Sequence, residues 1–76
     1  MNPRVRSVTA SPNFTVKIIF TNDEQKLFDV KPYLNSGIFT ELKNQAKFAT
    51  VKVENGTISW EGGQDFCPDT LYLEGV

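Results

Sequence analysis

The chain has 76 residues, of which 39% are hydrophobic and 12% aromatic, with a net charge of −1 and no histidine. A chain this short forms one thin-cored domain, and its hydrophobic content excludes an intrinsically disordered protein. Its single cysteine excludes an intrachain disulfide framework, and its longest aliphatic-aromatic run, residues 18–20, is too short to span a bilayer.

The first part of the chain has the composition of antiparallel strands. Residues 5–10 are predicted to form a strand, closed by a turn at residues 11–13 that contains proline and asparagine. Residues 15–20 are β-branched and aromatic, which is typical of a strand. A turn at Asn22 and Asp23 then returns the chain along residues 25–30. A two-residue and a three-residue loop give different pairs here, so the register stays open.

The middle of the chain is predicted to be helical. Pro32 ends the preceding strand, and a short helix over residues 38–43 follows. Three apolar side chains share one face of that helix at i, i+3 and i+4 spacing: Ile38, Phe39 and Leu42. A further turn beginning at residue 44 or 45 carries Ala46 and Phe48.

Residues 50–60 contain the clearest local signal, an Asn55-Gly56 pair between two alternating segments. Both positions of a tight hairpin turn need positive φ, which asparagine and glycine tolerate. This turn predicts four facing pairs: Glu54 with Thr57, Val53 with Ile58, Lys52 with Ser59, and Val51 with Trp60. The apolar members of these pairs then share one face of the hairpin.

The last segment is predicted to contain a turn at residues 61–64 and then a helical turn or a last short strand. Pro68 suits the first turn of a helix, and Asp69 suits the same N-terminus. The predicted fold class is therefore α+β, a small antiparallel β-sheet built from two hairpins with a short helical segment between them.

One domain is expected to span residues 1–76, with residues 1–4 as a loose N-terminal tail. No apolar run follows the first residues, so we expect no signal peptide, no membrane segment and a reducing cytoplasmic location. Because so small a core is thin, a homodimer or a permanent partner is also expected.

The available side chains argue against catalysis. Without histidine the chain lacks the usual general base and the commonest metal ligand. Cys67 lies between Asp65 and Asp69, whose charges disfavour a thiolate, so it is expected to be a small half-buried apolar side chain. Two carboxylates and a thiolate are also ill-matched for any one metal. We expect no catalytic residue, no metal and no cofactor.

Charge is divided unevenly along the chain. Residues 1–53 contain eight basic and four acidic side chains, whereas residues 54–76 contain five acidic and no basic ones. An acidic surface with aromatic anchors suits a basic protein partner. The candidate partner-binding residues are Trp60, Glu61, Asp65, Phe66, Asp69 and Tyr72. Trp60 also suits the core, packed against Val51, and the sequence leaves both interpretations open.

The alternative is a nucleic-acid surface on the first sheet. Five basic side chains are spread over that region: Arg4, Arg6, Lys17, Lys26 and Lys31. A binding platform would also need exposed aromatic side chains, for which Phe14, Phe20 and Phe28 are the candidates. The negative net charge argues against strong binding to a polyanion, so nucleic acid is the weaker expectation.

Several blocks of the sequence together resemble one bacterial family. They are residues 4–8, Leu-Phe-Asp-Val-Lys-Pro-Tyr-Leu at 27–34, residues 48–53 and 56–60, and Asp-Phe-Cys-Pro-Asp-Thr-Leu-Tyr at 65–72. In this order they closely resemble the family catalogued as domain of unknown function 2442, over nearly the whole chain.

The resemblance implies a small α+β domain with no established catalytic residues. Some relatives carry a helix-turn-helix domain after this one, and others are encoded beside a second small protein, a pairing suggestive of toxin and antitoxin. We expect this chain, which ends at Val76, to lack the helix-turn-helix domain. The expected function is a non-enzymatic protein-binding module, the antitoxin-like half of a two-gene pair. The alternative is a nucleic-acid-binding or transcription-regulatory accessory domain.

Overall fold

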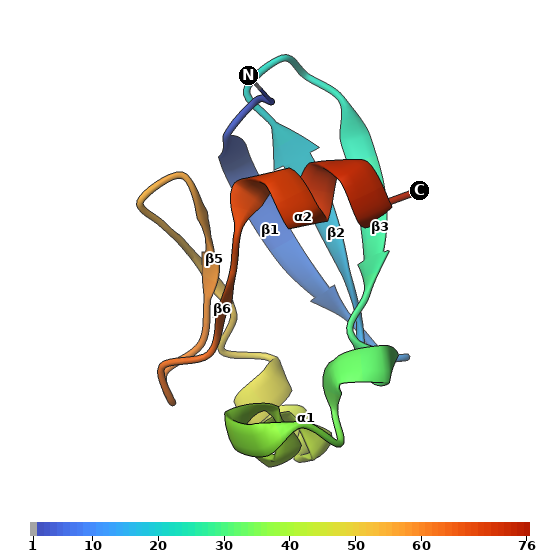
Figure 1. Ribbon diagram of the computed structural model, residues 1–76, viewed down its shortest axis with the longest axis vertical. Helices are drawn as coiled ribbons and strands as arrows, with labels where there is room; N and C mark the ends of the chain where they lie inside the picture. Colours follow the sequence, from blue (N-terminus) through green and yellow to red (C-terminus); the bar gives the residue numbers. More distant parts are fainter. Residues whose placement is uncertain (1) are drawn as a thin grey trace.

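The computed structural model describes residues 2–76 and contains two three-stranded antiparallel sheets with short helical segments (Figure 1). The first sheet has the order β1 (Val5–Ser11), β2 (Thr15–Phe20) and β3 (Gln25–Asp29). The second has the order β4 (Lys52–Glu54), β5 (Thr57–Ser59) and β6 (Asp65–Phe66). The predicted α+β class and both hairpins are confirmed, the strand predicted over residues 5–10 forms β1, and the second hairpin gains an unpredicted third strand, β6.

Four short helices complete the fold of residues 2–76. In sequence, β3 is followed by the 3-10 helices η1 (Lys31–Tyr33) and η2 (Gly37–Lys43) and the α-helix α1 (Gln45–Phe48), which precede β4. The α-helix α2 (Pro68–Glu74) follows β6, with proline in its first turn as the sequence predicts. Figure 1 shows α2 lying across the first sheet, with the other helices at the opposite end of the molecule from the N-terminus.

The first sheet is built on the alternation in β2. Val16, Ile18 and Phe20 are fully buried, while the intervening side chains are exposed or half-buried. In the β2–β3 pair Val16 faces Phe28, which is also buried. Successive side chains of a strand point to opposite faces, so this strand supplies one wall of the core.

Phe20 and Glu24 close the hairpin loop between β2 and β3, so the loop has three residues, 21–23, and the open register is resolved. The amide of Phe20 donates to the carbonyl of Glu24 at 2.8 Å, and the amide of Asp23 donates to the carbonyl of Phe20 at 2.9 Å. Asp23 has φ 69°, as expected for the last residue of a three-residue hairpin loop. Aspartate tolerates this left-handed conformation, so the loop needs no glycine.

The expected loose tail is described in part. Met1 lies outside the described residues, while Asn2 and Pro3 are half-buried. The carbonyl of Arg4 accepts a hydrogen bond from the amide of Thr21 at 2.8 Å. Arg4 therefore lies against the first sheet, and Asn2 donates to Asp69 of α2.

The Asn55-Gly56 hairpin forms with the predicted register. Glu54 faces Thr57, Val53 faces Ile58 and Lys52 faces Ser59, and the two turn residues have φ 53° and 78°. The fourth predicted pair, Val51 with Trp60, lies outside the ladder, because β4 begins at Lys52 and the amide of Trp60 donates to the carbonyl of Gln64. The apolar face is not uniformly buried, however: Ile58 is fully buried and Val53 is 38% exposed. Val53 lies on the edge strand β4, whereas β5 is central and covered on both faces.

The predicted helix over residues 38–43 is a 3-10 helix, and this changes which side chains share a face. Leu42 is buried, Phe39 is half-buried and Ile38 is 57% exposed. With three residues per turn, positions i and i+3 align, so Phe39 stays with Leu42 and Ile38 turns away. The grouping of Ile38 with the other two side chains is therefore wrong.

Of the two candidate starts for the next turn, Asn44 is the N-cap of α1, and its side chain accepts from two backbone amides.

The core lies between the first sheet, α2 and the second sheet. Leu71 anchors α2 in this core and is fully buried. The end of the chain covers the outer edge of β3, where Leu27 and Val76 exchange two backbone hydrogen bonds of 2.9 Å.

None of the helices described in residues 2–76 has the length and apolar character needed to cross a membrane.

Candidate functional site

The two largest apolar candidates for partner binding are core residues. Trp60 is 2% exposed, and its indole N–H donates to the carbonyl of Phe48 at 2.8 Å. Phe66 is 8% exposed and packs against four other aromatic rings. Of the two interpretations of Trp60, the structure shows the core one, and neither side chain is exposed as an anchor.

Tyr72 is half-buried and is engaged within the domain. Its ring packs edge-on against Phe20 with centroids 5.1 Å apart, and its hydroxyl donates to Glu24 Oε1 at 2.6 Å. Lys26 lies 4.1 Å above the ring centroid and also donates to the carbonyl of Tyr72. These contacts tie α2 to the β2–β3 hairpin.

Because of the Tyr72–Glu24 hydrogen bond, we expect the free energy of unfolding to fall at both low and high pH. The tyrosine hydroxyl lowers the pKa of Glu24 below its ordinary value of 4.5, and the carboxylate raises the pKa of Tyr72 above its ordinary value of 10.0. The contribution of Glu24 is present above pH 4.5 and is lost as pH falls through its lowered folded pKa. The contribution of Tyr72 is present below pH 10.0 and is lost as pH rises through its raised folded pKa.

Tyr72→Phe tests this prediction because it removes only the hydroxyl. An NMR titration of the Glu24 carboxyl is expected to give a higher pKa in the variant, closer to the ordinary value. The matched control is Tyr33→Phe, since the Tyr33 hydroxyl donates to Glu74 instead and this contact raises the pKa of Tyr33. An unchanged Glu24 pKa in Tyr72→Phe would show that the hydrogen bond does not set it.

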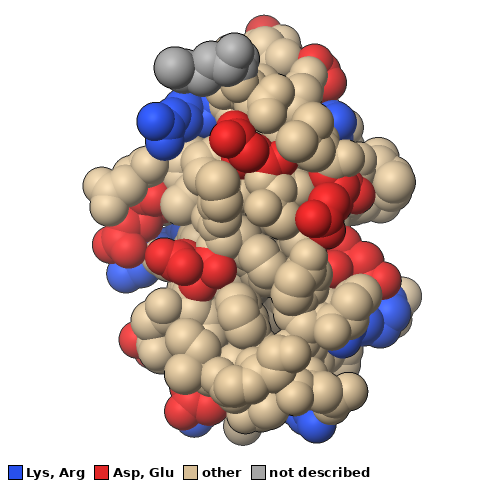
Figure 2. All heavy atoms as spheres, in the orientation of Figure 1, with Lys and Arg blue, Asp and Glu red and all other residues tan. Residues whose placement is uncertain are grey.

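The three acidic candidates are exposed, and we call Glu61, Asp65 and Asp69 the acidic face. Glu61 and Asp65 make no side-chain hydrogen bond or ion pair with any other residue in 2–76, and Asp69 accepts one hydrogen bond, from Asn2. In the view that shows α2 and β6, red acidic side chains lie across the face and blue basic ones lie mainly at its margins (Figure 2).

Cys67 corrects one expectation, since its side chain is exposed and not half-buried. It is the N-cap residue of α2, in an extended conformation that leads out of β6. Within residues 2–76, no three side chains of histidine, cysteine, aspartate or glutamate group as ligands for a metal ion.

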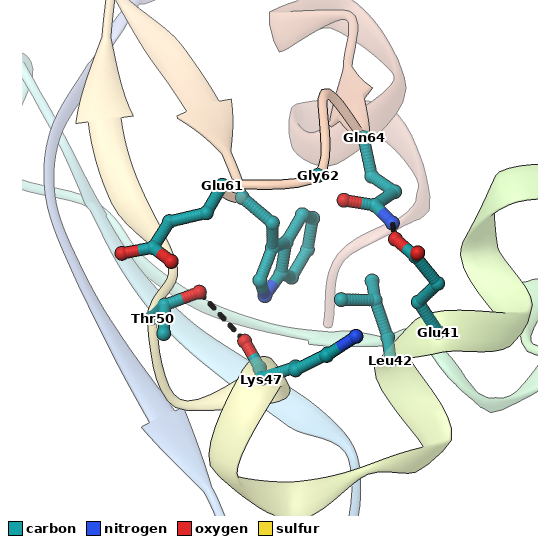
Figure 3. Close-up of a pocket in the computed structure, with 8 residues that line it drawn as sticks. Glu41, Leu42, Lys47, Thr50, Glu61, Gly62 and Gln64 are labelled. Atoms are coloured by element: carbon teal, nitrogen blue, oxygen red, sulfur yellow. Dashed lines mark hydrogen bonds between the residues drawn. The ribbon is translucent and has the colours of Figure 1, made fainter.

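A pocket of about 240 Å³ opens between η2, α1 and the turn after β5 (Figure 3). Its lining residues are Glu41, Leu42, Lys47, Thr50, Trp60, Glu61, Gly62 and Gln64, and we call it the Gln64 pocket. Of the sequence candidates it contains Trp60 and Glu61. Asp65, Phe66, Asp69 and Tyr72 lie outside it.

Gln64 is the most unusual residue of this pocket. Its side chain is 1% exposed, and its amide nitrogen donates to the carbonyl of Ile38 at 2.7 Å and to Glu41 Oε2 at 3.0 Å. Its amide oxygen Oε1 is buried and has no hydrogen-bond partner. Both partners of the nitrogen are acceptors, so a flipped amide would place oxygen against oxygen. The orphaned atom is therefore the oxygen.

Gly62 packs closely against this pair of polar groups. A Cβ on Gly62 would lie 2.6 Å from Glu41 Oε2 and 2.7 Å from Gln64 Oε1, so any larger residue would have to displace them. The sequence analysis missed Glu41 and Gln64, which are 23 positions apart. The spacing of Gln64 and Phe66 was a usable signal, because residues i and i+2 of an extended segment share a face.

The basic region of the first sheet does not form an aromatic platform in the described residues. Phe20 and Phe28 are buried, and Phe14 is half-buried with its ring edge-on to Phe48. Two of the basic side chains are paired on the surface, Arg6 with Asp23 and Lys31 with Asp29. The bases of a nucleic acid therefore find no exposed ring of this set to stack on.

A family model described as Protein of unknown function (DUF2442) matches residues 5–76. The chain belongs to this family. The match confirms the resemblance found in the sequence and includes both sheets, α2, the acidic face and every residue of the Gln64 pocket. Comparison with curated proteins and with solved structures found no match.

Proposed function

We propose that this DUF2442 domain is a non-enzymatic protein-binding module that docks a basic partner protein on its acidic face. The observation that carries the proposal is that Glu61 and Asp65 are exposed and form no ion pair within residues 2–76. Unpaired surface charge of one sign steers an oppositely charged partner and rejects partners of like charge.

The same charge favours a different protein over a second copy of this chain. A two-fold dimer places the same surface patch on both subunits, so an isologous contact through the acidic face would bring carboxylates together. Such a contact costs free energy unless the charges are neutralised. A homodimer formed through this face is therefore the weaker candidate.

The family resemblance suggests where to look for the partner. The resemblance implies that some relatives are encoded beside a second small protein, so we propose that this chain is the antitoxin-like half of a two-gene pair acting in the cytoplasm. In this arrangement it would bind and neutralise the product of the neighbouring gene.

Co-expression with the neighbouring gene product tests the proposal. The tagged chain is expected to retain that protein, and retention is expected to fall at least about tenfold in the triple variant Glu61→Gln, Asp65→Asn, Asp69→Asn. The matched control is Asp23→Asn, Asp29→Asn, Glu54→Gln. It removes the same charge from acids that are already paired on the surface.

Equal retention by the two triple variants would overturn the role of the acidic face. Failure of the wild-type chain to retain the neighbouring protein would overturn the antitoxin-like role. Raising the salt concentration should weaken the wild-type complex more than that of the acidic-face variant, because exposed charges are screened by salt.

A further inference from the structure

We infer that the Gln64 pocket binds one guanidinium group, supplied by an arginine side chain of the basic partner. This inference rests on the proposed function for the source of the group. The chemistry of the site is argued from the pocket itself, from an unpaired acceptor, an unbalanced charge and an aromatic side chain in the lining.

The unpaired acceptor is Gln64 Oε1. A buried carbonyl oxygen without a hydrogen-bond partner destabilises the state that contains it, and such groups are rare in native proteins. This oxygen belongs to a side chain that is 1% exposed and lines the pocket. Figure 3 shows the amide nitrogen on the side of Gln64 that faces Glu41 and the oxygen on the other side. A ligand that satisfies it must be a hydrogen-bond donor.

The charge of the lining calls for a cation. Glu41 and Glu61 contribute two negative charges and Lys47 contributes one positive charge, so the lining carries a net −1. None of the ion pairs within residues 2–76 involves these three side chains. One bound monovalent cation would bring the lining to neutrality, which a water molecule could not do.

The arrangement favours guanidinium over ammonium. The acceptors come from three separate residues, Glu41, Glu61 and Gln64, and guanidinium offers five N–H donors in one plane. Trp60 also lines the pocket, and a guanidinium held beside its ring would gain a cation–π contact. A volume of about 240 Å³ is below the range of drug-sized ligand sites but is sufficient for the end of one side chain.

An NMR titration of the full ¹⁵N-labelled chain tests the inference. Methylguanidinium chloride, added at constant ionic strength, is expected to shift the Trp60 indole N–H and the Gln64 side-chain amide with a Kd in the millimolar range. Methylammonium chloride is expected to bind at least about fivefold more weakly. Peptides distinguish the source of the group: acetyl-Gly-Arg-Gly-amide is expected to bind, and its neutral citrulline counterpart is not.

Variants place the binding in the pocket. Glu61→Gln is expected to weaken methylguanidinium binding about tenfold, since a charged hydrogen-bond partner is lost. Glu54→Gln is the charge-matched control, because Glu54 lies outside both the pocket and the acidic face and is expected to leave the Kd unchanged. Gly62→Ala is a second, steric variant: its methyl group would lie 2.6 Å from Glu41 Oε2 and 2.7 Å from Gln64 Oε1, so it should displace both acceptors and abolish binding.

Absence of a saturable shift with methylguanidinium would overturn the inference. Equal binding of methylammonium, or of the citrulline peptide, would overturn the choice of guanidinium.

Co-expression separates this inference from the proposed function. If the acidic-face variant loses the partner while methylguanidinium fails to bind, the docking face stands and the pocket assignment falls. If methylguanidinium binds and the neighbouring protein is not retained, the pocket assignment stands and the antitoxin-like role falls.

Discussion

Trp60→Ala is expected to lower the free energy of unfolding by about 3–5 kcal/mol. The indole is 2% exposed and packs beside Phe48 and Phe66, with ring centroids 5.8 and 6.0 Å away. Its removal leaves a cavity, and it also leaves the carbonyl of Phe48 without its donor. A domain of this size has a total stability of roughly 4–11 kcal/mol, so the variant should lose most of it.

Urea denaturation followed by far-UV circular dichroism measures this change without relying on tryptophan fluorescence. Trp60→Phe is expected to lose about 1–3 kcal/mol, because it keeps a ring but not the N–H donor. Leu73→Ala is the control, since Leu73 is 71% exposed and should change stability by no more than about 0.5 kcal/mol. A Trp60→Ala variant as stable as Leu73→Ala would contradict the core position of the indole.

Phe66→Ala is expected to destabilise the domain by about 3–5 kcal/mol and to disrupt the contact between the two sheets. Phe66 belongs to β6 of the second sheet, and its ring lies 4.9 Å from that of Phe28 in β3 of the first. Tyr33 and Phe39, from η1 and η2, pack against the same ring at 4.9 and 5.0 Å. One side chain therefore joins four elements, and aromatic pairs of this kind each add about 0.5–1.5 kcal/mol beyond burial.

Near-UV circular dichroism should register this loss, because it reports the fixed environment of aromatic rings. Phe66→Leu keeps much of the apolar volume and is expected to cost less, about 1–2 kcal/mol. If Phe66→Ala reduced partner retention while leaving the free energy of unfolding unchanged, Phe66 would be an interface residue and its assignment to the core would be wrong.

The burial of Trp60 and Phe66 changes the nature of the proposed interface. A docking face with large exposed aromatic anchors would draw its affinity from apolar burial. The acidic face offers exposed carboxylates instead, and the cavity beside it offers one recessed site. Association through such a surface should be fast and strongly salt-dependent, because charge steers the encounter.

Local sequence determined those parts of the fold that depend on a few neighbouring residues. The Asn55-Gly56 turn fixed the register of β4 and β5, because both turn residues must have positive φ. Pro68 marked the start of α2, since its missing N–H would be unpaired there in any case. The split in charge also belongs to the sequence, and it located the acidic face that the structure leaves exposed.

Tertiary structure decided what depends on residues far apart in the chain. An apolar side chain suits a core and an interface equally well, so only packing could place Trp60 and Phe66 inside. The first hairpin could close with a loop of two or three residues, and the burial of Val16, Ile18 and Phe20 goes with the three-residue one. The Gln64 pocket is the clearest case. Its buried amide meets Glu41 across 23 positions, and no local periodicity encodes a contact between a 3-10 helix and a distant turn.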